Sequence, residues 1–109
     1  MATVSIKKGY LEILNTLGSA DAIVENALRK YLIDKCVERI DKSKRKIVEL
    51  EKKYNSSYAE FIKTISNEER LKGVEKISQD WEGDMTEWEY WEKELEEWKM
   101  RLEDILMKS

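Results

Sequence analysis

The sequence lacks several residue types on which common enzyme chemistry depends. It has no histidine and no proline, a single cysteine and four glycines among 109 residues. Without histidine there is no imidazole base and no Ser-His-Asp triad, and one cysteine cannot form a CxxC pair or a zinc site with histidine. Three carboxylates on one helix face, Glu89, Glu92 and Glu96, lack the Glu-x-x-His motif of helical di-metal sites. We therefore expect a binding protein with no catalytic residues, no metal and no cofactor.

Long apolar runs are also missing. No stretch approaches the ~20 residues that cross a bilayer, and residues 1–9 lack the apolar segment of a signal peptide. We expect a cytoplasmic protein that does not contact membranes. The composition, with 39% charged and 41% hydrophobic residues, is typical of long helices and coiled coils.

Charge is divided unevenly along the chain, although the net charge is only -3. Up to Tyr54 there are 12 basic and 8 acidic residues, a balance of +4, and beyond it there are 8 and 15, a balance of -7. The asymmetry predicts an N-terminal part that seeks anions and a C-terminal part that meets a basic partner. We divide the chain into residues 1–54, a linker region at 55–79 and an acidic arm at 80–109.

The N-terminal part begins with a pattern typical of a strand. Residues 3–7 alternate polar and apolar side chains, which predicts a short strand with Thr3, Ser5 and Lys7 on one face. Residues 10–17 have leucines at intervals of three and predict an amphipathic helix that ends at Gly18.

A long helix is predicted next, from residue 20 to about residue 54, with Ser19 as its N-cap. It would span ~52 Å, more than the ~34 Å diameter of a compact chain of this size, so we expect an elongated molecule. Apolar residues are dense as far as Ile40 and sparse after it, which predicts that the helix enters a core early and then leaves it. Cys36 is expected to be buried there as a small apolar residue.

The region after the long helix is less regular. Asn55-Ser56-Ser57 has turn chemistry, residues 58–65 predict a short helix, and residues 68–79 predict a marginal helix or a linker.

All four tryptophans lie in the acidic arm, where large apolar residues recur every three or four positions, as in the seam of a coiled coil. We call the following six residues the tryptophan stripe: Trp81, Met85, Trp88, Trp91, Leu95 and Trp98. The stripe could pack on Ile47, Leu50 and Tyr54 of the long helix, on a second copy, or on another protein. We predict it as a partner-binding surface for a small basic protein.

Residues 4–32 resemble the ribbon-helix-helix family of DNA-binding proteins. The resemblance rests on the strand Val4-Ser5-Ile6-Lys7, the leucine-rich helix, Gly18-Ser19, and the sequence Ser-Ala-Asp-Ala-Ile-Val-Glu-Asn-Ala-Leu-Arg-Lys-Tyr-Leu at residues 19–32. It implies a mainly α fold with an N-terminal ribbon-helix-helix, a long second helix and a helical C-terminal arm. It also implies a homodimer on double-stranded DNA, with Thr3, Ser5 and Lys7 contacting bases and Ser19 and Ala20 holding a phosphate.

Many members of this family are antitoxins whose C-terminal extension wraps a toxin, and the acidic arm is similar to such an extension. The resemblance therefore implies an antitoxin-type transcriptional repressor that binds DNA and neutralises a partner toxin. The rival hypothesis, drawn from the coiled-coil pattern, is a helical adaptor or structural protein with no DNA function, whose C-terminal helix packs on its own long helix.

Overall fold

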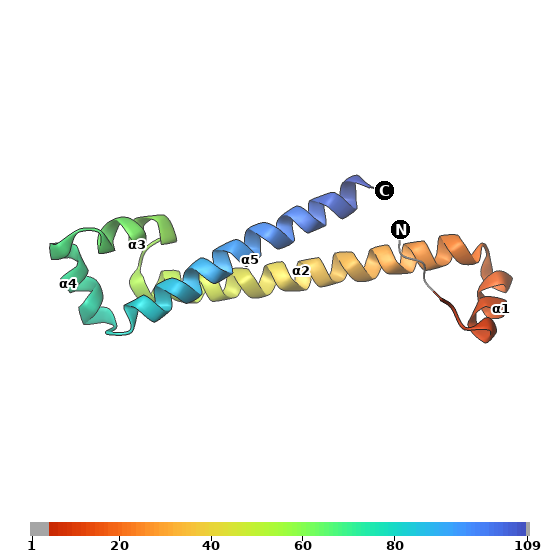
Figure 1. Cartoon of the computed structure of the whole chain (residues 1–109), viewed down its shortest axis with the longest axis horizontal. Helices are drawn as coiled ribbons and strands as arrows, with labels where there is room; N and C mark the ends of the chain where they lie inside the picture. The colour runs from red at the N-terminus through yellow and green to blue at the C-terminus, as the bar shows by residue number, and fades with distance from the viewer. Residues whose placement is uncertain (1–4, 109) are drawn as a thin grey trace.

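The structure, a computed structural model, describes residues 5–108, and within that range all regular structure is helical (Figure 1). The helices in chain order are α1 (Lys8–Leu17), α2 (Ala20–Tyr54), α3 (Tyr58–Ile65), α4 (Glu68–Ile77) and α5 (Trp81–Met107). The predicted helices over residues 10–17, 20–54 and 58–65 are confirmed, and the marginal segment after residue 68 is a helix. The prediction of an elongated molecule is also confirmed, because the principal dimensions are 69 × 24 × 22 Å.

The two long helices form an antiparallel hairpin in which α5 runs back along α2 (Figure 1). Near the end where α3 and α4 lie, Lys53 Nζ is 2.6 Å from Asp84 Oδ2. Two heptads further along both helices, the guanidinium of Arg39 lies over the ring of Trp98. One more heptad away, Leu32 and Ile105 line the same hollow. The register is therefore that of an antiparallel coiled coil, with a repeat of seven residues on each helix.

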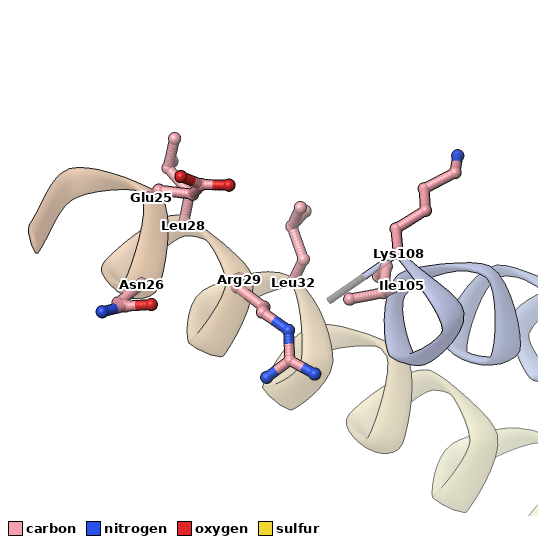
Figure 2. Close-up of a pocket in the computed structure, with 7 residues that line it drawn as sticks. All are labelled: Glu25, Asn26, Leu28, Arg29, Leu32, Ile105 and Lys108. Atoms are coloured by element: carbon pink, nitrogen blue, oxygen red, sulfur yellow. The ribbon is translucent and has the colours of Figure 1, made fainter. Parts of the chain in front are cut away.

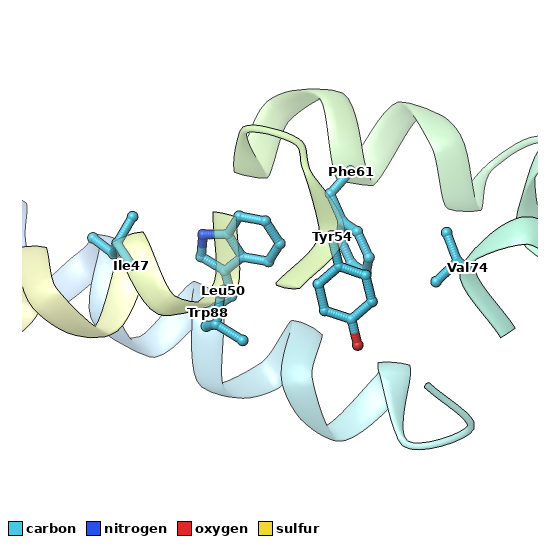
Figure 3. Close-up of a cluster of buried hydrophobic side chains, with 6 residues drawn as sticks. All are labelled: Ile47, Leu50, Tyr54, Phe61, Val74 and Trp88. Carbon is cyan, nitrogen blue, oxygen red and sulfur yellow. The ribbon is translucent and has the colours of Figure 1, made fainter. Parts of the chain in front are cut away.

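The hydrophobic core lies at the end of the hairpin that α3 and α4 cover (Figure 3). Its most buried side chains are Trp88 and Phe61, whose ring centroids are 5.1 Å apart. The buried members of the core are Ile47, Leu50, Tyr54, Phe61, Val74 and Trp88. Helices α2, α3 and α4 thus contribute the side chains that pack around Trp88 of α5.

Local sequence explains where the helices begin and end. The hydroxyls of Ser19 and Ser57 accept hydrogen bonds from backbone N–H groups in the first turns of α2 and α3. The side chain of Asn67 does the same for two N–H groups of α4. Asn55 ends α2 in the left-handed conformation, with φ of 49°, which asparagine tolerates better than most residues. The tight turn it makes returns the chain toward the core.

The predicted ribbon-helix-helix fold is wrong. Residues 5–7, the described part of the predicted strand, are not in a strand, and α1 begins directly after them at Lys8. A strand exists only when a second strand pairs with it, and none is present among residues 5–108, so a β-ribbon has no basis in that range. Thr3, part of the same prediction, lies outside the described residues.

The predicted position of the core along α2 is also wrong. The apolar residues that are dense before Ile40 are largely exposed, whereas the sparse ones after it, Ile47, Leu50 and Tyr54, are buried. Cys36 is buried as expected. The reason lies in the antiparallel register: α5 starts beside the end of α2, so its tryptophans cover the C-terminal half of α2. The N-terminal half of α2 is left with much of its apolar surface uncovered.

Candidate protein-binding surface

The structure places the tryptophan stripe against α2, which is the self-packing arrangement among the alternatives. Trp88 is fully buried, and the other five members are half-buried. The ring of Trp88 stacks on Tyr54 at 6.0 Å and meets Tyr58 at 5.6 Å. Another protein could bind through the whole stripe only if α5 left α2, at the cost of the core around Trp88.

The half-buried tryptophans make polar and cationic contacts within the chain. The indole N–H of Trp98 donates to Glu94 at 2.6 Å, and that of Trp91 donates to Glu87 at 3.5 Å. From α2, Lys42 lies 5.6 Å from the centre of the Trp91 ring, and Arg39 lies 5.7 Å from that of Trp98. Such cation–π contacts are electrostatically favourable. They add interhelical contacts at Trp91 and Trp98, which are one heptad apart on α5.

A polar cluster of Lys53, Tyr54 and Asp84 joins the two helices beside the core. One carboxylate oxygen of Asp84 accepts hydrogen bonds from both the Tyr54 hydroxyl and the Lys53 ammonium group. Burial, and then the hydrogen bond to Asp84, raise the pKa of Tyr54 to about 12. Burial opposes ionisation of Asp84, but its hydrogen bonds from Lys53 and Tyr54 hold its pKa below the ordinary value. The cluster links the last turn of α2 to the first turn of α5 and so helps to fix the register of the hairpin.

Uncovered apolar side chains gather at the opposite end of the rod. On α1, Tyr10, Ile13 and Leu17 lie at i, i+3 and i+7 and are 61%, 62% and 74% exposed, and no residue of α1 is buried. On α2, Leu28, Tyr31 and Leu32 are 45%, 59% and 48% exposed. We call these six residues, together with the hollow described next, the open end of the hairpin.

The hollow has a volume of about 560 Å³ and lies between the first half of α2 and the last turn of α5 (Figure 2). Leu28 and Leu32 project from α2 on the side where Ile105 of α5 and Lys108, the residue after that helix, lie. Glu25, Asn26 and Arg29 complete its lining. The Nε atom of Arg29 is buried and has no hydrogen-bond partner within residues 5–108. The hollow therefore combines apolar walls with charged groups of both signs.

Four of the five residues predicted to contact DNA lie in the described part of the chain, around the two ends of α1. Ser5 is exposed, and Lys7 precedes α1 with its Nζ 5.9 Å from the centre of the Tyr10 ring. Ser19 caps α2, where its hydroxyl accepts a long hydrogen bond of 3.5 Å from the Ala22 N–H, and Ala20 is buried. Thr3 lies outside residues 5–108. Contact of these residues with DNA therefore stays a prediction, although the β-ribbon that was expected to present them is absent from residues 5–108.

Residues 5–108 contain neither a group of metal ligands nor a helix that could cross a membrane. No group of three or more acidic, cysteine or histidine side chains there could hold a metal ion. No helix in the same range combines the length and apolar character needed to span a membrane. Comparison of the chain with protein-family models, curated proteins and solved structures gave no match.

The open end is the surface that sequence analysis missed. The signal was present, because the sequence has a dense apolar segment before Ile40 as well as the tryptophan stripe. One antiparallel hairpin, whose two long helices are joined through α3 and α4, pairs the stripe with the nearer half of the long helix. The remaining apolar segment, residues 20–40, then extends toward and beyond the end of the acidic arm.

Proposed function

We propose that the protein is a helical adaptor that binds another polypeptide through the open end of its hairpin. The observation that carries the proposal is the exposure of six large apolar side chains at one end of a rod whose other end has a complete core. This is the coiled-coil alternative from the sequence, with the C-terminal helix packed on its own long helix.

The size of the exposed surface supports binding. The six side chains are 45–74% exposed, and at ~150–250 Å² for a large side chain they present roughly 500–850 Å² together. The largest apolar patch on a typical monomer is ~300–600 Å² and is often functional, and larger patches mark interaction sites. A partner that covers the open end would remove this surface from water, at a gain of ~25 cal/mol per Å² of apolar area buried.

Site-specific photo-crosslinking tests this proposal. A photoreactive phenylalanine analogue at Tyr31, in the open end, is compared with the same analogue at Val48, which is 42% exposed on α2 beside the core. We expect a defined covalent adduct with a polypeptide from position 31 and none from position 48 when the protein is expressed in its native cells. Equal labelling from both positions, or none from either, would contradict the proposal.

The acidic face of α5 supports a second candidate function, the binding of a small basic protein. Helix α5 contains ten acidic and three basic residues, a net charge of -7. Ion pairs within residues 5–108 involve three of these carboxylates, those of Asp84, Glu89 and Glu97. Burial and the nearby Glu51 raise the pKa of Glu92, so at least one carboxylate is in an unfavourable setting. A basic partner would relieve this repulsion and would be steered by the field.

Salt dependence separates this candidate from binding at the open end. Binding of a basic protein to α5 should weaken as salt is raised through the physiological range, where the Debye length is ~8 Å. Replacing the exposed Glu96 and Glu103 by Gln should weaken it as well, while the same changes should leave crosslinking from position 31 intact. A partner whose affinity is unaffected by salt and by both substitutions does not use this face.

A further inference from the structure

We propose that the polypeptide bound at the open end is a second copy of this chain, with α1 of each copy packed into the hollow of the other. The inference rests on the proposed function and names the partner for the same surface. It starts from the presence of two unsatisfied features on one molecule. One is the apolar stripe of α1, Tyr10, Ile13 and Leu17, which is largely exposed in the described chain. The other is the hollow between α2 and α5, whose walls are partly apolar.

The two features match in chemical character and in position. The stripe Tyr10, Ile13 and Leu17 is a helical ridge, and the hollow is a helix-lined groove with Leu28, Leu32 and Ile105 in its walls. An amphipathic helix that lies in such a groove is a common mode of recognition. Each chain carries both the ridge and the groove. A single two-fold axis therefore places the ridge of each copy in the groove of the other, as in an isologous dimer.

The exposed area fits a dimer of ordinary size. Stable interfaces bury ~800 Å² on each partner, and the six apolar side chains of the open end present roughly 500–850 Å² before the polar rim is counted. Contacts between crystal neighbours are smaller and poorly packed by comparison. The open end is therefore large enough to hold two copies together without any other surface.

Charge also favours a second copy at this end. Residues 5–35 carry five basic and four acidic side chains, a net charge of +1. Electrostatic repulsion between the N-terminal parts of two open ends is therefore small. Glu25, Arg29 and Lys108 line the hollow, so a two-fold axis can bring cations of one copy close to the carboxylate of the other. Eight of the ten acidic residues of α5 lie between Glu82 and Glu97, away from the hollow, and only Glu103 and Asp104 adjoin it. Two copies joined at their open ends therefore keep most of their acidic residues apart.

Mass measurement on the full chain is the first test. Light scattering coupled to gel filtration, from about 1 to 100 μM, should give twice the chain mass of 13.0 kDa. Replacing Leu28 and Leu32 together by Asp should raise the dissociation constant of the dimer at least ~30-fold, the effect of losing one interface hot spot. Val48→Asp, on the same helix and similarly exposed, is the matched control and should leave the dimer intact. A wild-type chain that stays monomeric throughout would overturn the proposal.

Disulfide trapping tests the packing of α1 itself, and it does not depend on the double Asp variant folding. Cys36 is the single cysteine and is replaced by Ala in all chains. One chain then carries Ile13→Cys and a second carries Leu32→Cys. On mixing and mild oxidation we expect a covalent heterodimer from this pair, and none when Val48→Cys replaces Leu32→Cys. Equal trapping with both would show that α1 of one copy does not lie in the hollow of the other.

The photo-crosslinking experiment distinguishes failure of this inference from failure of the proposed function. An adduct of two identical chains from position 31 supports both. An adduct with a different polypeptide, together with a monomeric purified chain, retains the adaptor function and overturns the second copy as its partner. No adduct at position 31 and a monomeric chain together overturn both.

Discussion

At the scale of single residues, Trp88 lies at the centre of the hydrophobic core. It is the largest side chain with no exposed surface, and it contacts aromatic rings from α2 and α3. Large aromatic pairs contribute beyond the area that they bury. The remaining tryptophans of the stripe are half-buried and keep polar contacts, so their side chains are not equivalent to that of Trp88.

We predict that Trp88→Ala lowers the free energy of unfolding by about 3–5 kcal/mol, because it leaves a large cavity at the junction of several helices. Tyr90→Ala, an exposed aromatic two residues away on α5, should change it by less than ~1 kcal/mol. Denaturant titration followed by circular dichroism gives both values. Similar losses for the two variants would mean that Trp88 is not the centre of the core.

Tyr54 predicts a loss of stability at high pH. Its pKa in the folded chain is about 12, against 10.0 for an ordinary tyrosine, so the unfolded chain releases the proton first as pH rises. The contribution is fully present below pH 10 and is lost between about pH 10 and 12. Two pKa units correspond to about 2–3 kcal/mol.

The measurement is the free energy of unfolding across this pH range for Tyr54→Phe and for the wild type. The difference between them should shrink as pH rises from 10 to 12. If the difference in free energy of unfolding between Tyr54→Phe and the wild type stayed constant over this pH range, the pKa of Tyr54 would not be raised in the folded chain.

At the scale of helices, glycines mark where the backbone is and is not constrained. Gly73 lies inside α4 with open space where a Cβ would be, whereas Gly18 ends α1 with φ of 150°, a conformation that other residues rarely adopt. The same substitution should therefore have opposite effects at the two positions.

Gly73→Ala should stabilise the protein by ~0.5–1 kcal/mol, because alanine favours the helix and no neighbour obstructs its Cβ. Gly18→Ala should destabilise the junction of α1 and α2 by ~1–3 kcal/mol. No residue of α1 is buried, so the second effect should appear as faster amide exchange in α1 and a small change in melting temperature. A fall in melting temperature for Gly73→Ala would contradict the first expectation.

The elements themselves could largely be predicted from sequence, because their signals are local. Ser19 and Ser57 cap α2 and α3, and the regular spacing from Trp88 to Ile105 defines α5. The strand predicted at residues 3–7 is wrong for residues 5–7, because alternating polar and apolar residues indicate a strand only where a second strand pairs with it, and pairing is a property of the whole fold. The predicted location of the core along α2 was wrong, because the density of apolar residues on one helix does not indicate which part of it another helix covers.

At the scale of the whole molecule, the hairpin is a rod with one closed end and one open end (Figure 1). Its radius of gyration is 21.8 Å, compared with ~13 Å for a compact chain of this length. At the end covered by α3 and α4, the closed end, Trp88, Phe61 and Val74 are buried. At the open end, the six apolar side chains are 45–74% exposed. The shape therefore separates a self-sufficient core from a surface that needs another chain.

This separation makes the shape of the dimer predictable. If two rods overlap only over the open ends, from residue 20 to residue 35 of α2, the overlap is about 24 Å at 1.5 Å per residue. Two rods of 69 Å then give a particle about 110 Å long. Two rods packed side by side through α5 along their full length would remain close to 69 Å and would bring their acidic helices together. Charge repulsion between two helices of net charge -7 opposes that arrangement.

Small-angle X-ray scattering measures the maximum dimension directly. We expect about 110 Å for the wild-type chain, and a return to the single rod, with a radius of gyration near 21.8 Å, for the Leu28→Asp, Leu32→Asp variant. Raising the salt concentration should leave the long dimer unchanged, because its interface is apolar and its acidic arms are already screened from each other. A particle of twice the mass but close to 69 Å long would show that the copies lie side by side, and the open end would then not be the dimer interface.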